Sequence, residues 1–303
     1  MPSARRLAPP FVATVIAFAW TTASAQGLPV GASVANASVT GWSQLDADID
    51  GGGETRGYGA FAIGSFTKQF TPEVTAGVTL RYDQENWRWS GDNAFGGAPF
   101  SRIHRPAIAG TFVYAAGNGI AWTVLPSIQW AYASGASTGD AQNWGAVFAV
   151  SKTFSPDLTL GLGAGVFREI GENEAFPVLI VDWRLSDRLR LRNPSQAGPA
   201  GGAGLELVWT HDERWEFAAG GAWRHYRFRL DRNGSVPDGV GEKNAIPLLA
   251  RATWRPTPAS TLDLYAGAAL AGEITLYDRD DNEVVSRDFD PVPIFGISFQ
   301  MRF

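Results

Sequence analysis

Apolar and polar residues alternate along several short segments of the chain. Residues 74–83, 246–254, 262–271 and 295–303 each place larger apolar side chains at every second position. The positions between them hold smaller or polar side chains. Because successive side chains of a β-strand point to opposite faces, this pattern predicts strands with one apolar face and one more polar face.

Two kinds of connection separate these segments, and the two kinds alternate along the chain. The first kind is tight, and the second is longer, polar and rich in glycine. The tight connections lie near 71–73, 116–119, 155–157, 186–188, 212–214 and 255–260, and the longer ones near 47–56, 91–104, 135–142, 171–174, 193–202, 231–243 and 278–289. Short periplasmic turns that alternate with longer outer loops are typical of transmembrane barrels.

The number of connections predicts the fold class. We expect an all-β protein, an antiparallel up-and-down transmembrane β-barrel of about 14 strands. The weakest expected strand lies near Leu189 to Asn193, and without it a barrel of 12 strands is the alternative. An even strand number places both chain ends on the periplasmic side.

Large aromatic residues recur at two heights of the expected barrel. Trp130 follows Trp122 by eight residues, and Trp223 follows Trp215 by the same interval. Eight residues of a tilted strand rise about 20 Å, close to the apolar band of about 25 Å between two aromatic girdles. We expect the following residues in these girdles: Trp122, Trp130, Trp183, Trp209, Trp215, Trp223, Trp254 and Phe303.

Both ends of the chain carry export features. Arg5 and Arg6 precede an apolar run at 11–20 and a small-residue site at 23–25, which predicts a cleaved signal peptide over 1–25 and one barrel domain over 26–303. A terminal Phe303 after an alternating strand is similar to the C-terminal assembly signal of outer-membrane barrels. We therefore expect the barrel-assembly machinery as a partner and the outer membrane of a Gram-negative envelope as the location, in contact with lipid and lipopolysaccharide.

Composition excludes several classes of function. The chain has no cysteine, which rules out thiol catalysis and cysteine metal sites. A formal net charge of −5 argues against nucleic acid as a partner.

Several segments in the second half of the chain resemble a family of uncharacterised bacterial outer-membrane β-barrel proteins, a domain of unknown function. The likeness covers mainly residues from about 160 to the end. The segments are 181–191, 197–206, 226–230 and 262–268. The resemblance implies the fold and the location, and it assigns no substrate and no functional residue.

Charged residues occupy many positions on the expected inner face. Nearly all of the basic ones are arginine, which pairs well with carboxylates in confined sites. These residues either line a water-filled pore and set its selectivity, or pair with one another and fill the lumen. The candidates are Arg81, Asp83, Asp182, Arg184, Glu206, Glu216, Arg224, Arg251, Asp263, Glu273 and Arg302.

Catalytic and metal-binding chemistry has little support. His104 belongs to an expected loop, His211 to a tight turn and His225 to a strand, and none lies near a serine motif of the kind found in barrel phospholipases. Residues 46–51 follow the spacing of a calcium loop, but Gly57 stands where the bidentate glutamate should be. We expect no enzyme activity, no cofactor and no metal site.

Porin-like passive passage of small solutes is the function that this pattern favours. A structural or surface barrel that conducts nothing is the main alternative. A lipid-modifying enzyme of the outer membrane is a distant third.

Overall fold

The computed structural model describes residues 28–194, 198–199 and 202–303, and the predicted signal peptide lies outside this part of the chain. Among the described residues, no helix is long and apolar enough to cross a membrane. The strands are β1 (Ser33–Asp48), β2 (Glu54–Gln69), β3 (Val74–Ser90), β4 (Arg102–Gly117), β5 (Ile120–Trp130), β6 (Tyr132–Ala133), β7 (Gln142–Ser155), β8 (Leu158–Arg168), β9 (Asn173–Arg184), β10 (Leu189–Arg192), β11 (Gly204–Thr210), β12 (Trp215–Ala222), β13 (Arg224–Arg229), β14 (Val240–Thr257), β15 (Ser260–Tyr277), β16 (Glu283–Phe289) and β17 (Val292–Arg302).

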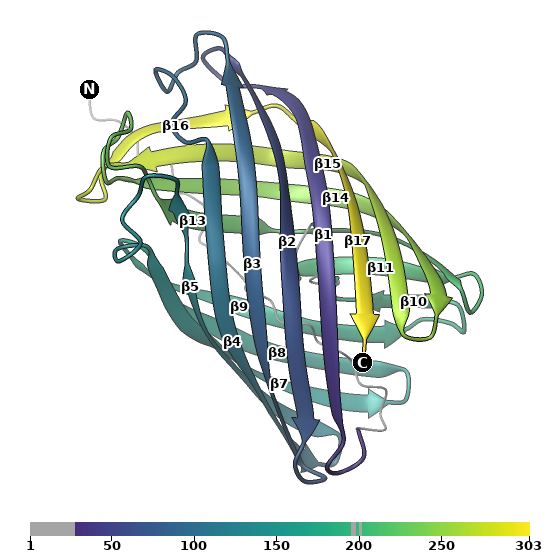
Figure 1. The fold of residues 1–303 in the computed structure, drawn as a ribbon. Coiled ribbons are helices and arrows are strands. Elements are labelled where there is room, and N and C mark those ends of the chain that lie inside the picture. Colours follow the sequence, from purple (N-terminus) through teal and green to yellow (C-terminus); the bar gives the residue numbers. More distant parts are fainter. Residues whose placement is uncertain (1–27, 195–197, 200–201) are drawn as a thin grey trace, which may run out of the picture.

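The strands form one closed antiparallel barrel (Figure 1). Three of the crossings are split into two segments each, β5 with β6, β12 with β13 and β16 with β17, so the wall has fourteen crossings. β17 closes the barrel against β1, in a register that runs from Asn36 opposite Arg302 to Gln44 opposite Ile294. The predicted fold class is confirmed. The expected weak strand is present as β10, which has only four residues.

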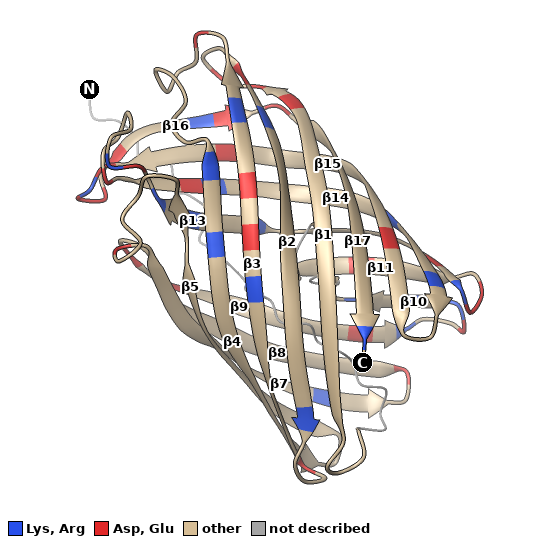
Figure 2. Ribbon diagram, viewed as in Figure 1, with Lys and Arg blue, Asp and Glu red and all other residues tan. Residues whose placement is uncertain are grey.

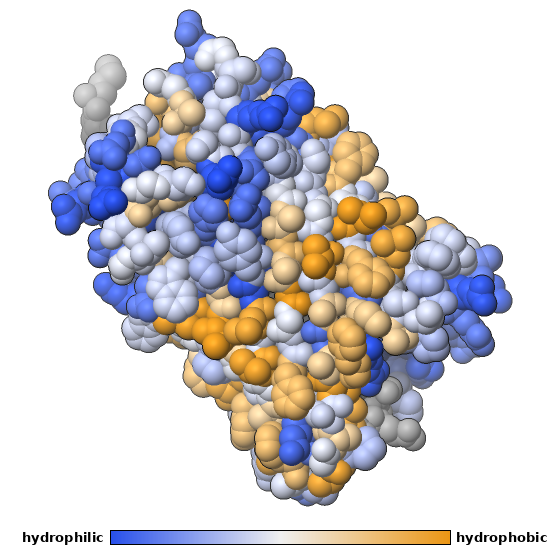
Figure 3. Space-filling view, in the orientation of Figure 1, coloured by the Kyte–Doolittle hydropathy of each residue, from blue (hydrophilic) through white to orange (hydrophobic). Residues whose placement is uncertain are grey.

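The alternation along the strands separates an apolar outer surface from a polar interior. Leu162 on the outer face is 68% exposed, whereas Asp263 and Ser298 on the inner face are buried. Figure 3 shows apolar residues in a band across the front of the barrel, between hydrophilic regions at its two ends. An apolar band of this kind faces lipid.

The predicted girdle residues lie on this outer surface. Trp122, Trp183, Trp209, Trp215, Trp254 and Phe303 are exposed near the end with the tight turns, which we call the periplasmic end. Trp130 and Trp223 lie at the opposite, outer end of the apolar band and are less exposed. The rings of Trp215 and Trp254 stack across the β12–β14 pair, with centroids 6.4 Å apart.

The periplasmic turns are held by local hydrogen bonds. In the β11–β12 turn, the carboxylate of Asp212 accepts hydrogen bonds from the backbone N–H groups of Arg214 and Trp215, both 2.8 Å long. These hydrogen bonds favour the ionised carboxylate and therefore lower the pKa of Asp212.

The strands extend further beyond the apolar band than the sequence pattern predicts. β16 occupies Glu283–Phe289, where we expected a loop. β4 begins at Arg102, so His104 lies in a strand and not in a loop. Charged residues interrupt the apolar positions of these outer segments, such as Ile103 and Phe289, and their pattern therefore resembled loop sequence.

At the outer end, the wall contracts to a smaller ring that the sequence did not predict. β6 pairs with β4 on one side and, in parallel, with β13 on the other, where Arg229 lies opposite Tyr132. An isolated bridge between Ile49 and Phe289 joins β16 to β1. The resulting outer ring contains β1, β2, β3, β4, β6, β13, β14, β15 and β16, and it leaves out β7 to β11.

We predict that Leu162→Arg destabilises the folded barrel by about 2–4 kcal/mol, the cost of a cationic side chain on the lipid face near the bilayer midplane. Leu162 lies four positions above Leu158, which pairs with the girdle residue Trp183. Urea unfolding in lipid vesicles, followed by tryptophan fluorescence, measures the change. The control is Leu185→Arg, since Leu185 is exposed in a periplasmic turn. Equal effects of the two substitutions would contradict a lipid-facing surface at Leu162.

Candidate functional site: the barrel interior

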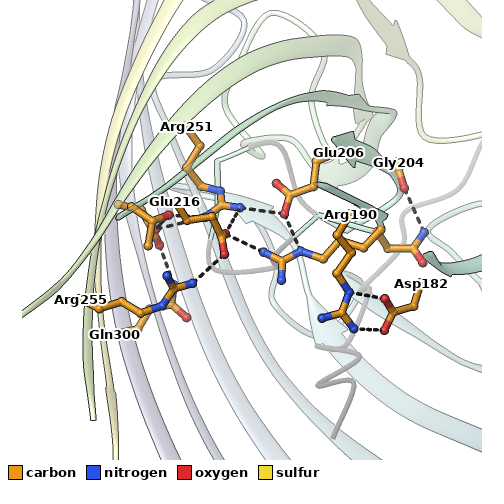
Figure 4. Close-up of polar contacts among 12 residues, drawn as sticks. Asp182, Arg190, Gly204, Glu206, Glu216, Arg251, Arg255 and Gln300 are labelled. Carbon is orange, nitrogen blue, oxygen red and sulfur yellow. Dashed lines mark hydrogen bonds and ion pairs between the residues drawn. The ribbon is translucent and has the colours of Figure 1, made fainter. Parts of the chain in front are cut away.

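An arginine on β14 lies at the centre of a charged cluster in the periplasmic half of the lumen (Figure 4). The Arg251 guanidinium lies 2.9 Å from a carboxylate oxygen of Glu206 and 2.9 Å from one of Glu216. Asp263 follows at 3.5 Å. β14 pairs with β12 and β15, and β12 pairs with β11, so three neighbouring strands bring these carboxylates to one arginine.

Three further arginines connect this cluster to the periplasmic mouth. Arg192 bridges Glu206 and Glu216 at 3.0 Å each, and Arg255 binds Glu216 at 2.7 Å. Arg190 forms a two-point ion pair with Asp182, and Figure 4 shows this pair beside the Arg251 cluster. The side chains of Arg190, Arg192 and Arg255 are about a third exposed, so water reaches this half of the lumen.

A second charged cluster lies higher, where the lumen narrows toward the outer ring. Glu85 on β3 accepts hydrogen bonds from Arg105 at 2.6 Å, from Arg224 at 3.0 Å and from the Tyr226 hydroxyl at 2.6 Å. Asp83 binds Arg81 at 2.7 Å and Arg105 at 3.0 Å. Figure 2 shows the matching bands of acidic and basic residues on β3 and β4.

Aromatic rings cover the cations of this upper cluster. The Arg105 guanidinium lies 4.0 Å from the centre of the Tyr226 ring, and the Lys243 ammonium lies 3.3 Å from the centre of the Trp87 ring. Arg81 and Arg224 have similar contacts with Phe61 and Trp42. Arg81, Arg105, Arg224 and Lys243 face the carboxylates of Asp83 and Glu85, so basic groups outnumber acidic ones here.

Above this cluster, a packed apolar core fills the outer ring. Phe228 and Ile103 are completely buried, and Trp87 is nearly so. The Phe228 ring packs edge-on against Phe100 at 4.9 Å between centroids. The ring is therefore the narrowest part of the lumen.

Two residues between β10 and β11 lie in the lumen. Gly198 and Pro199 are buried, and the Pro199 carbonyl accepts a hydrogen bond from Arg224 at 3.2 Å. A Cβ atom added to Gly296, on the inner face of β17, would lie 3.1 Å from Pro199. Glycine at position 296 thus leaves room for Pro199 beside the inner face of β17.

Eight of the predicted lumen residues point into the interior. They are Arg81, Asp83, Asp182, Glu206, Glu216, Arg224, Arg251 and Asp263.

Three of the predicted lumen residues lie elsewhere. Arg184 is exposed at the periplasmic rim, 3.6 Å from Asp157, and Arg302 is exposed at the end of β17, because both lie beyond the last inward position of their strands. Glu273 faces outward, where it accepts a hydrogen bond from Ser286 at 2.8 Å. A register shift between β14 and β15, with a positive φ at Ala271, reverses the alternation before Glu273.

Sequence reasoning missed several members of both clusters. Arg105 and Lys243 fall at the borders of expected loops, and Arg190, Arg192 and Arg255 fall on the short strand or in a turn. Strict alternation from Ala107 back to Arg105 would have found the first of these residues. The contact of Arg224 with Pro199 has no signal in the sequence.

The fold and the two surfaces together define the class of protein. The barrel is closed and antiparallel, with an apolar outer band, a polar interior and both described chain ends on the periplasmic side. These features define a transmembrane β-barrel. Its location is the bacterial outer membrane.

Comparisons with known proteins find similarity in the path of the backbone. No family model matches the chain, and no curated protein sequence matches it. An outer membrane channel from Pseudomonas putida F1 is 12% identical with a TM-score of 0.49, over 91% of this chain and 97% of the other. A FadL homologue from Pseudomonas aeruginosa is 10% identical with a TM-score of 0.47, over 89% and 90% of the two chains. The P. putida toluene transporter TodX is 9% identical with a TM-score of 0.45, over 91% of both chains.

We predict that Arg251→Met destabilises the barrel by about 3–5 kcal/mol, because three buried carboxylates lose their shared cation while the side-chain volume is kept. Urea unfolding in lipid vesicles measures the loss. The control is Arg184→Met, which removes an exposed ion pair and is expected to cost about 0–1 kcal/mol. A loss at Arg251 no larger than at Arg184 would show that the cluster does not stabilise the wall.

Proposed function

We propose that this protein is a passive channel for small solutes in the outer membrane. The observation that carries the proposal is the wet, charged periplasmic half of the lumen. Fourteen crossings enclose more space than wall side chains fill. In addition, Arg190, Arg192 and Arg255 remain about a third exposed inside it. A lumen filled only by structural ion pairs would bury these side chains.

The upper cluster supports a preference for anions. Solutes that move between the two halves pass Arg81 and Arg224, whose side chains are about a fifth exposed. Fixed charges beside a narrow passage set the sign of the ion that enters it. Because basic groups are in excess at this level, we infer that negatively charged solutes pass more readily than positively charged ones.

A barrel that conducts nothing is the second candidate function, and the apolar core of the outer ring favours it. Reconstitution into a planar bilayer distinguishes the two. Stepwise conductance supports the channel. A heat-modifiable, folded protein without conductance supports the structural role.

The double substitution Arg81→Ser with Arg224→Ser is expected to shift the preference of the channel toward cations, because it removes two of the cations beside the passage. The reversal potential under a salt gradient reports the shift. Arg184→Ser at the exposed rim is the matched control and is expected to leave the reversal potential unchanged. If the double variant keeps the reversal potential of the unmodified protein, these two arginines do not select the ion.

Phe228→Ala is expected to raise single-channel conductance at least twofold, because it removes a completely buried ring from the narrowest part of the lumen. Heat-modifiable migration on gels verifies that the variant is folded. Phe217→Ala, on the lipid-facing surface of β12, controls for the loss of a ring. Unchanged conductance in a folded Phe228 variant would move the constriction away from the outer ring.

A further inference from the structure

The wall has a seam between β9 and β13 at the outer end. β9 pairs with β10 only from Asp182 to Arg184, and β13 turns away from the wall to pair with β6 and β14. In the described part of the chain, no backbone ladder joins β9 to β13. Side chains from the outer face of β13 instead meet the tip of the β8–β9 hairpin.

A histidine and two glutamates meet at this seam. His225 lies on β13, Glu174 is the second residue of β9, and Glu169 lies in the hairpin tip. One possible ligand atom from each residue lies within 4.8 Å of those of the other two. The His225 Nε2 atom is 4.0 Å from a carboxylate oxygen of Glu169, and both side chains are 1% exposed.

The orientation of the His225 ring is set from β14. Its Nδ1 lies 2.5 Å from the Asn244 side-chain oxygen, and the Asn244 amide donates to Glu242 at 3.1 Å. Because that oxygen only accepts, Nδ1 carries the proton and donates it. The lone pair of the neutral ring is then on Nε2, which is directed at the two glutamates. A metal-binding histidine is normally held in this way by its second ring nitrogen.

Among the described residues, no cation forms an ion pair with Glu174 at the seam. Both oxygens of Glu174 are buried and accept no hydrogen bond from the described residues. The nearby Arg227 is engaged elsewhere, with Glu172 at 2.8 Å, with Asp281 and with Glu242 at 3.6 Å. Burying a carboxylate without a compensating partner is costly, so a bound cation would stabilise this arrangement.

We propose that His225, Glu169 and Glu174 bind a divalent transition metal, with Zn²⁺ as the best fit. One imidazole nitrogen and two carboxylates form a ligand set that suits Zn²⁺ better than Ca²⁺ or Mg²⁺, which prefer oxygen alone. Ligand atoms of a tetrahedral zinc ion lie about 3.4 Å from one another, so the three groups need to close by only about an ångström. Water completes the coordination.

The bound metal would hold the two sides of the seam together. It links β13, which closes the outer ring, to the β8–β9 hairpin, which belongs to the wider wall. Glu172 in the hairpin tip has a side chain 45% exposed, so the site lies next to solvent on the outer side. This proposal stands independently of conduction.

Calorimetric titration of the chelator-treated, folded protein with Zn²⁺ tests the proposal, together with urea unfolding in the presence and absence of the metal. We expect one site per chain with micromolar or tighter affinity, a higher urea midpoint with Zn²⁺, and no comparable effect of Mg²⁺ or Ca²⁺. His225→Ala and the nearly isosteric Glu174→Gln should each weaken binding at least tenfold and remove the shift of the midpoint. His211→Ala, in an exposed periplasmic turn, is the matched control and should bind normally.

Two results would overturn the proposal. The first is the absence of saturable Zn²⁺ binding to the folded protein. The second is binding that persists in both the His225 and the Glu174 variants, which would place the metal elsewhere. If Glu174→Gln raises the urea midpoint of a protein that binds no metal, the two glutamates share a proton instead.

Discussion

Closure of the backbone ladder is the constraint on which the rest of this structure depends. Within a bilayer, every N–H and C=O group must find a partner inside the protein, and a β-sheet achieves this only by joining its first strand to its last. Here β1 pairs with β17 over nine residue pairs, which completes the wall. Once the cylinder is closed, each side chain has only two directions, toward lipid or toward the lumen.

The charged residues of the barrel interior form ion pairs with one another. Arginines and carboxylates of the lumen pair across neighbouring strands, as Arg251 does with residues of β11, β12 and β15. Arginine suits this role because its planar guanidinium binds several carboxylates at once and stays charged in a confined space. The periplasmic half remains hydrated at its margins, whereas the upper half combines cations with aromatic rings. This division gives the lumen a wide wet portion and a narrow portion in which cations lie against aromatic rings.

The outer ring and the seam both arise because β13 leaves the wall. When β13 leaves the wall to pair with β6, it closes a smaller ring above the lumen and exposes the edge of β9. The ring gains an apolar core, while the seam is bridged by side chains, among them Arg227 with Glu172. The narrow outer ring and the seam therefore share one short strand, β13.

The local pattern determined much of this protein. Alternation along β3, β14 and β17, the order of short and long connections and the spacing of Trp122 and Trp130 are local properties, and they predicted the barrel, its fourteen crossings and its lipid-facing surface. The residues of the inner face could be predicted where the alternation continued without a break, as for Arg81 and Asp263.

The tertiary structure alone decided the rest. A bulge of one residue near Ala271 reversed the direction of Glu273, the short β10 allowed Pro199 into the lumen, and the pairing of β13 with β6 brought His225 to Glu169. These contacts join residues far apart in the chain. Their geometry depends on how the closed wall bends, which no alternation of neighbouring residues encodes.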